Sequence, residues 1–412
     1  RFLFRSRYLY DLDSVNFALG LEHFDPELHQ PHPPGYFLYV WLGRLARAVF
    51  GDPNAALVAI SITASCAAVV VIYALAQEWF GRRAALGAGL VFLFSPLGWF
   101  HGTVALTYIV EAFFSALLGY LCWRGRWAWA ALTLGVAAGF RQSSVLMLGP
   151  LWLYSLRRAS RRQMAGSFAL LAATVLGWLV PMLLQAGGVG NYAASLHQMW
   201  TLVPAREAML PVGRVVAVGL GALLCLGSAV LLPFFERGTQ RLSKEQRVFV
   251  WMWIGPGLAF FTLVFFQFVN SGYLLVLAPP VFALLGWQAA AAACSWRGAA
   301  LAAANVALYL YAPAYCSYGA VRRLETELVE IERGVRQLGR PEHLVVLAYP
   351  SHFLGYRHAA YYLPEYLTVH FPEAAWRGAM VALAMKDRTT RRPESLPLDP
   401  QREHEGLAGA SS

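Results

Sequence analysis

Charged residues are scarce in this chain of 412 residues: they make up 14% of it, against 58% hydrophobic residues, and the mean hydropathy is +0.47. A soluble globular protein is about one quarter charged and about half apolar. The composition therefore excludes an ordinary cytosolic enzyme, a disordered chain and a coiled coil. Lysine is almost missing, with Lys244 and Lys386 alone among 33 basic residues, so arginine carries the net charge of +10. The arginines stand in short bursts between apolar stretches, which is typical of membrane topology and not of a nucleic-acid-binding domain.

Cysteine is also sparse, with five residues and no Cys-x-x-Cys pair, so we interpret the thiols as buried structural ones. An initiator methionine, a signal peptide and an apolar first helix are missing before Arg1. We expect the natural chain to extend further upstream.

Long apolar stretches predict membrane-spanning helices, each of which needs roughly 20 residues. We count ten: 54–78, 84–99, 105–123, 127–140, 144–156, 165–186, 214–235, 248–267, 273–293 and 298–314. Two of them, 127–140 and 144–156, are short for a full crossing.

The short turns between these stretches differ in charge. Turns on one side hold thirteen Arg and Lys residues, and turns on the other hold only Arg141, Arg206 and Arg214. Because basic residues favour the cytoplasmic side, the richer side is predicted to be cytoplasmic. With ten spans, both termini then lie outside the cytoplasm.

This topology predicts an all-α polytopic membrane protein with a small extracytoplasmic α/β C-terminal tail. In the tail, 321–338 has helical apolar spacing, and 344–349 and 366–370 are expected to be strands. The predicted parts are a first extracytoplasmic loop with an interfacial helix (1–53), a transmembrane body (54–314), an extracytoplasmic segment (315–385) and a disordered tail (386–412).

The first loop contains an Asp-x-Asp pair, Asp11 and Asp13, ahead of apolar residues at helical spacing, Phe17, Leu21 and Phe24. The spacing places Asp13 at a helix N-terminus, where a carboxylate is often only a cap. A single cap does not need the second carboxylate of Asp11.

A rigid turn follows, with the sequence His-Gln-Pro-His-Pro-Pro-Gly from His29. Its prolines restrict the backbone and hold His32 in place. The amphipathic run from Tyr36 to Phe50 suits a helix in the outer interface, with Arg44 and Arg47 reaching lipid headgroups. A zinc site is an alternative, although the spacing matches no standard pattern; its ligands would come from His23, His29, His32, Asp11, Asp13 and Asp25.

Residues 10–44 resemble the first extracytoplasmic loop of the GT-C superfamily of polyprenyl-phosphate-sugar-dependent glycosyltransferases, in the branch of protein O-mannosyltransferases and lipid A aminoarabinose transferases. The matching motifs are Asp-Ser-Val-Asn-Phe at 13–17 and His-Pro-Pro-Gly-Tyr at 32–36. Weaker matches are at 80–83, 139–142, 271–275 and 353–366. Ser14 and Asn16 depart from the acidic and basic residues usual at their positions.

The resemblance implies a GT-C fold and a sugar donor linked to a polyprenyl phosphate. Phosphate leaves as a stable anion, so the reaction needs one general base and cations near the phosphate. The resemblance implies that Asp13 is the base, that Asp11 is its substitute or a metal partner, and that His32 and Arg141 bind the donor phosphate. Arg141 at a helix end could instead reach lipid headgroups.

Three further residues are candidates for binding the acceptor or the sugar: Glu111, Tyr273 and Tyr36. Glu111 lies near the outer end of an apolar stretch, where an ionisable group is costly; it could instead pair with His101. Tyr273 could instead belong to an aromatic belt. Metal dependence is open, but Asp11, Asp13 and Glu111 are compatible with Mg²⁺ or Mn²⁺. The loop 187–213 is a further candidate for the acceptor site, through Asn191, His197, Trp200 and Arg206.

The predicted function is an inverting membrane glycosyltransferase, a hexosyl- or pentosyltransferase, acting on the extracytoplasmic face of a bacterial inner membrane. Its partners would be a polyprenyl-linked sugar, a lipid, glycan or protein acceptor and membrane lipids, but not nucleic acid. Two alternatives remain open. One is a carrier or flippase of lipid-linked sugars, and the other is an inactive subunit of a cell-envelope complex.

Overall fold

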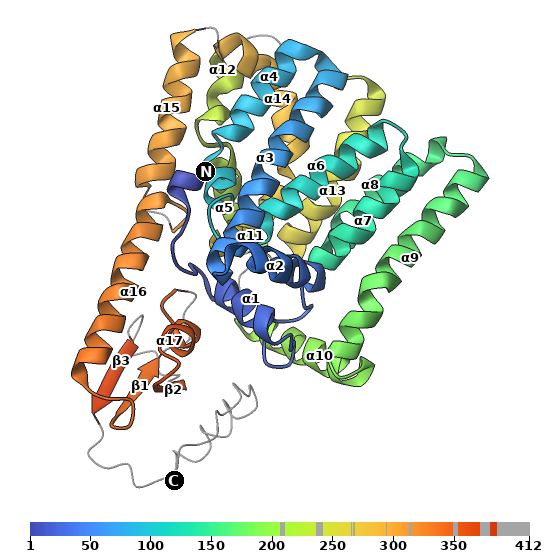
Figure 1. The fold of residues 1–412 in the computed structure, drawn as a ribbon. Coiled ribbons are helices and arrows are strands. Elements are labelled where there is room, and N and C mark those ends of the chain that lie inside the picture. The colour runs from blue at the N-terminus through green and yellow to red at the C-terminus, as the bar shows by residue number, and fades with distance from the viewer. Residues whose placement is uncertain are drawn as a thin grey trace.

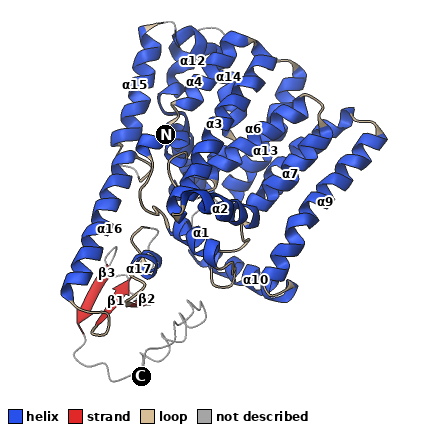
Figure 2. Cartoon of the chain, viewed as in Figure 1, coloured by secondary structure: helices blue, strands red, loops and turns tan. Residues whose placement is uncertain are grey.

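The computed structural model describes residues 1–412 with these exceptions: 207–210, 236–241, 265, 267, 294, 313–314, 349–352, 371–379 and 385–412. Cys294 and the predicted disordered tail 386–412 lie outside the described residues. Figures 1 and 2 show a bundle of roughly parallel and antiparallel helices, with a small sheet below one side of it. The described cysteines are unbridged, and of these Cys66 is exposed while the others are buried.

The helical bundle confirms that every predicted apolar stretch contains helix. Its α-helices are α3 (Pro53–Phe80), α4 (Arg82–Leu93), α5 (Pro96–His101), α6 (Tyr108–Trp123), α7 (Trp127–Phe140), α8 (Ser143–Ser155), α9 (Arg161–Gln185), α11 (Pro211–Leu226), α12 (Leu232–Phe235), α13 (Lys244–Leu263), α14 (Ala278–Ala293) and α15 (Trp296–Tyr311). The 3₁₀ turns are η1 (Phe2–Phe4), η2 (Leu156–Arg158), η3 (Gly227–Leu231) and η4 (Phe268–Val276).

Two of the predicted spans are interrupted. The stretch 84–99 is divided between α4 and α5, because Ser95 caps a new helix whose first residue is Pro96. The stretch 273–293 bends by 69° between η4 and α14. Among the described residues, three helices are individually long and apolar enough to cross a bilayer, and the bent pair is a fourth candidate. The number of ten crossings therefore stays a prediction.

The basic turns meet at one end of the bundle, as the sequence predicts. Arg124, after α6, pairs with Glu78 near the end of α3 at 2.7 Å. Arg157, after α8, pairs with Glu245 in the first turn of α13, also at 2.7 Å. The ends of α3 and α6, and those of α8 and the start of α13, are thus on the same side of the molecule. Figure 1 shows α1, α2, α10 and the C-terminal segment at the opposite end.

Helices α4 and α14 touch through two glycines. A Cβ atom on Gly87 would lie 2.1 Å from the carbonyl oxygen of Gly286, and one on Gly286 would lie 2.3 Å from the carbonyl oxygen of Ala84. Small residues at a helix contact allow this close approach of two backbones, as is common between membrane helices.

The elements at the other end are α1 (Leu12–Glu22), α2 (Phe37–Phe50), α10 (Val189–Arg206), α16 (Tyr318–Leu338), α17 (Tyr356–Tyr362), β1 (Leu344–Ala348), β2 (Leu367–His370) and β3 (Met380–Ala384). The predicted tail helix and both predicted strands are confirmed. The strand order is β2-β1-β3, with β2 parallel and β3 antiparallel to β1. The sequence did not predict β3 or α17, and the segment 187–213, expected to be a loop, contains the helix α10.

Helix α2 has the apolar outer face predicted for an interfacial helix, since Trp41, Leu45 and Val49 are exposed. Both of its arginines contact α1, and that they also reach lipid headgroups stays a prediction. Arg44 donates from Nε to the carbonyl oxygen of Leu21 at 2.9 Å, so it satisfies the C-terminal end of α1. Arg47 pairs with Glu22 in that same helix turn.

Candidate active site

The two aspartates of the first loop have different positions at the start of α1. Asp11 is the N-cap, and its carboxyl oxygen accepts a hydrogen bond from the backbone N–H of Asp13 at 2.9 Å. Asp13 lies in the first turn with 32% of its side chain exposed. The capping role that the sequence left open for Asp13 therefore belongs to Asp11, and Asp13 retains a solvent-accessible carboxylate.

Burial, together with the negative charge of Asp13, raises the pKa of Asp11 to about 8. The hydrogen bond from the Asp13 backbone opposes this shift. Asp11 is therefore mostly protonated at neutral pH. The Asp-x-Asp pair carries less negative charge than two free carboxylates would.

His32 lies against Asp13, as a base and an orienting partner would. Its Nδ1 is 3.3 Å from Oδ1 of Asp13, and its Nε2 is 3.0 Å from the hydroxyl of Tyr36. Burial lowers the pKa of His32, while Asp13 opposes this shift and Arg141 and Arg357 reinforce it. The imidazole is thus neutral at pH 7, and its Nδ1 lies close to Asp13 without forming a hydrogen bond among the described residues; its role toward a donor phosphate stays a prediction.

The turn that presents His32 has a constrained backbone. His29 and Tyr36 have positive φ angles of 56° and 45°, and Gly35 has 106°. Residues with side chains seldom adopt this region, and such strain is concentrated at functional sites. Two side chains fix the turn through the carbonyl oxygen of Pro34: Gln142 donates at 2.9 Å and Tyr192 of α10 at 3.0 Å.

Arg141 and Glu111 meet inside the bundle just beyond this turn. Nη1 of Arg141 lies 3.1 Å from Oε2 of Glu111, both side chains are buried, and Ser144 donates to Oε1 at 3.4 Å. The alternative in which Arg141 reaches lipid headgroups is therefore wrong. Glu111 does not pair with His101, whose ring lies against Tyr108. An acceptor contact for Glu111 stays a prediction.

Three tyrosines surround the Arg141 guanidinium. Its carbon is 4.0 Å from the ring centre of Tyr273, 4.9 Å from that of Tyr108 and 5.7 Å from that of Tyr36. These are cation–π distances. Tyr273 and Tyr36, predicted with Glu111 as acceptor or sugar contacts, therefore surround Arg141, and so does Tyr108, which was not predicted. Contacts of Tyr273 or Tyr36 with a sugar stay predictions.

A metal site is not formed by these side chains. Throughout the part of the chain that the structure describes, no group of three or more His, Cys, Asp or Glu residues is placed to hold an ion. The zinc alternative for the first loop is therefore not supported. Asp11 caps α1 and Glu111 faces Arg141, so the three carboxylates named for Mg²⁺ or Mn²⁺ have separate partners.

Among the described side chains of the segment 187–213, Tyr192 contacts the candidate site by a hydrogen bond to the carbonyl oxygen of Pro34. Asn191 and His197 lie on α10, and the side chains of Trp200 and Arg206 are outside the described residues. Gln142 could have been found from the sequence, because it follows Arg141 in the motif at 139–142. Tyr192 carried no signal, because its role depends on how α10 folds back on the turn.

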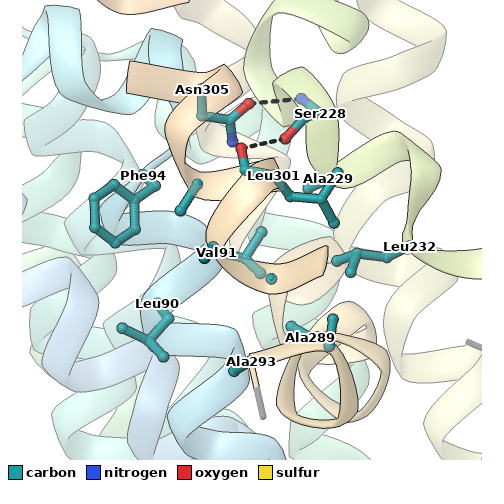
Figure 3. A pocket seen from close by; sticks show the side chains of 14 residues that line it. Leu90, Val91, Phe94, Ser228, Ala229, Leu232, Ala289, Ala293, Leu301 and Asn305 are labelled. Atoms are coloured by element: carbon teal, nitrogen blue, oxygen red, sulfur yellow. Dashed lines mark hydrogen bonds between the residues drawn. The ribbon is translucent and has the colours of Figure 1, made fainter. Parts of the chain in front are cut away.

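A separate apolar cavity of about 250 Å³ lies between α4, η3, α14 and α15 (Figure 3). Ser228 and Asn305 form its polar rim: Asn305 Oδ1 accepts from the backbone N–H of Ser228 at 2.6 Å. None of the predicted site residues lines this cavity.

Part of this sequence matches a known protein family, and the fold is similar to that of a solved structure. The family model described as dolichyl-phosphate-mannose-protein mannosyltransferase matches residues 31–184, a range that includes His32, Tyr36, Glu111 and Arg141. No curated protein matches the sequence. The crystal structure of ArnT from Cupriavidus metallidurans in the apo state superposes with a TM-score of 0.55 at 15% identity, covering 81% of this chain and 67% of that chain. The chain has the GT-C fold.

A second crystal structure, ArnT from the same organism bound to undecaprenyl phosphate, gives a TM-score of 0.55 at 14% identity, covering 81% of this chain and 69% of that chain. The GT-C fold confirms the all-α polytopic architecture and the membrane character expected from the sequence. The family model supports the resemblance to the GT-C superfamily from residue 31 onward, which includes the His-Pro-Pro-Gly-Tyr motif at 32–36. Asp11 and Asp13 precede the matched range 31–184.

Proposed function

We propose that this protein is an integral-membrane glycosyltransferase that moves a sugar from a polyprenyl-phosphate donor to an acceptor hydroxyl or amine, with Asp13 as the general base. The observation that carries the proposal is the Asp13–His32 contact of 3.3 Å, held at the bundle end where Arg141 is buried nearby. The GT-C fold, and the undecaprenyl phosphate bound to the ArnT of similar fold, support a lipid-linked donor.

In the proposed step, the acceptor oxygen or nitrogen attacks the anomeric carbon while its proton passes to the Asp13 carboxylate. The bond from that carbon to the phosphate oxygen breaks, and the polyprenyl phosphate leaves with the electron pair. Attack opposite the leaving group inverts the anomeric centre. One positioned carboxylate is sufficient, because phosphate leaves without a strong general acid.

His32 and Arg141 are the proposed cationic side of the donor site. A bound phosphate would raise the pKa of His32 and allow its ring to become a cation. Arg141 supplies a bidentate guanidinium, although Glu111 already neutralises its charge. The sugar and acceptor are proposed to contact Tyr273, Tyr36 and Glu111.

The proposed membrane is a bacterial inner membrane, with the candidate site and the C-terminal segment on the extracytoplasmic face. The clustering of basic turns at the opposite end of the bundle supports this orientation. The acceptor would be a lipid, a glycan or a protein.

The deciding experiment follows radiolabelled sugar from a panel of polyprenyl-phosphate donors into native membranes, with purified wild type and Asp13→Asn. We expect Asp13→Asn to fold normally and to transfer at least about a hundredfold more slowly, the usual effect of losing a general base. Asp25→Asn is the matched control, since Asp25 lies in the same loop, has 28% of its side chain exposed and faces His23.

Wild-type transfer by Asp13→Asn would overturn the assignment of the base. If folded wild type transfers sugar from none of the donors, the protein is instead a carrier or an inactive subunit. Movement of an intact lipid-linked sugar across vesicles would then separate those two alternatives.

A further inference from the structure

The C-terminal segment forms hydrogen bonds with the backbone just before Asp11 and Asp13. Arg322 of α16 donates to the carbonyl oxygen of Arg5, and the backbone N–H of Arg7 donates to Glu325 at 2.6 Å. The backbone N–H of Leu9 donates to the hydroxyl of Tyr362 at 2.8 Å. The segment after the bundle is therefore part of the wall around the candidate site.

Arg357 of α17 extends this contact into the first loop itself. Its Nη2 donates to the carbonyl oxygen of Leu28 at 2.9 Å, and its Nε donates to the hydroxyl of Tyr356 at 3.1 Å. Leu28 lies four residues before His32 in the same loop. Arg357 is also close enough to His32 for its charge to lower the pKa of that imidazole.

The guanidinium of Arg357 is buried and faces no carboxylate among the described residues, although it donates two hydrogen bonds and its carbon lies 5.3 Å from the ring centre of Tyr356. Only 2% of the residue is exposed, and its Nη1 has no hydrogen-bond partner among the described residues. Arg357 also takes part in none of the ion pairs that the described residues form. A buried guanidinium without an anion is costly, whereas Arg141 already has the carboxylate of Glu111.

We propose that Arg357 binds the phosphate group of the lipid-linked donor, so that the C-terminal segment contributes to the donor site beside His32. This proposal rests on the proposed function. Nη1, which has no partner among the described residues, can donate a charge-assisted hydrogen bond to a phosphate oxygen. The bond from Nη2 to Leu28 fixes the guanidinium against the loop that presents His32.

The test compares binding of undecaprenyl phosphate and of uncharged undecaprenol to the purified full chain in nanodiscs, read by tryptophan fluorescence. Wild type is expected to prefer the phosphate. Arg357→Gln is expected to bind undecaprenyl phosphate about ten- to a hundredfold more weakly, the range for losing a charge-assisted bond, and to bind undecaprenol as wild type does. Competition by inorganic phosphate shows whether the headgroup alone is recognised.

Arg322→Gln is the matched control, because Arg322 makes the same kind of bond from the C-terminal segment to a backbone carbonyl but is paired with Glu325. It should keep the wild-type preference for phosphate. Arg357→Lys retains a cation and should regain part of that preference, which keeps the test valid if the glutamine variant does not fold. A wild-type preference for phosphate in folded Arg357→Gln would show that Arg357 only holds the C-terminal segment against the first loop. If wild type binds undecaprenyl phosphate and undecaprenol equally well, the proposed polyprenyl-phosphate donor is wrong as well.

Discussion

The guanidinium of Arg141 lies 3.1 Å from the carboxylate of Glu111 inside the bundle, and three tyrosine rings enclose the pair on the guanidinium side. The two residues are 30 positions apart and come from the end of α7 and the first turn of α6. A charge pair at this depth is costly to form but more costly to break. It therefore fixes the orientation of Arg141 toward the candidate donor site.

Glu111→Gln should destabilise the protein by about 3–5 kcal/mol, because it leaves the Arg141 cation buried without a carboxylate. The double variant Glu111→Gln/Arg141→Gln should lose less stability than the sum of the losses of the two single variants. Unfolding in mixed micelles measures both. Glu78→Gln is the control: its pair with Arg124 is exposed, and we expect a loss below about 1 kcal/mol. Equal losses at the two sites would contradict the prediction.

Asp11 should make stability depend on pH. Its pKa rises from 3.8 to about 8 on folding, so the folded protein holds this proton more tightly than the unfolded chain does. The stabilisation is complete below about pH 4 and is lost as the pH rises toward 8. Asp11→Asn keeps a capping oxygen and removes the titration, so its unfolding temperature should fall less between pH 5 and pH 9. Parallel curves for variant and wild type would show that Asp11 does not titrate there.

Sugar transfer should survive EDTA. Glu111 faces Arg141 and Asp13 lies against His32, and among the described residues no three His, Cys, Asp or Glu side chains are placed around one ion position. The measurement is initial transfer rate before and after chelation, followed by addition of Mg²⁺ or Mn²⁺. Loss of activity that either ion restores would establish the metal dependence that the Asp-x-Asp pair allows.

Gly87→Ala should destabilise the bundle by about 1–3 kcal/mol, because the new methyl group would lie 2.1 Å from the carbonyl oxygen of Gly286. A backbone atom cannot move aside as a side chain would. Gly177→Ala is the matched control in α9, where a Cβ meets no atom within 4 Å. That control should be neutral or stabilising by up to about 1 kcal/mol. A neutral Gly87→Ala would mean that α4 and α14 are further apart.

Much of the helical body was predictable because apolar runs and basic turns are local signals. The interruptions of these helices were harder to predict. The break between α4 and α5 depends on Ser95 and Pro96, and the bend before α14 depends on packing. In the first loop, helical spacing predicted α1, but not which aspartate would cap it. Helix α10 was missed because its segment is less apolar than the spans around it.

The sequence by itself determined the membrane character, the helical stretches, the charge difference between the two ends, and the first-loop motif that contains Asp13 and His32. Only the tertiary structure decided the pairings: Asp13 with His32, Arg141 with Glu111, and Arg357 with the carbonyl of Leu28. The reason is physical. Hydropathy and helical spacing are properties of a few consecutive turns of chain. The partners of a buried charge come from helices and segments that are far apart in the sequence and meet only when the whole chain is packed.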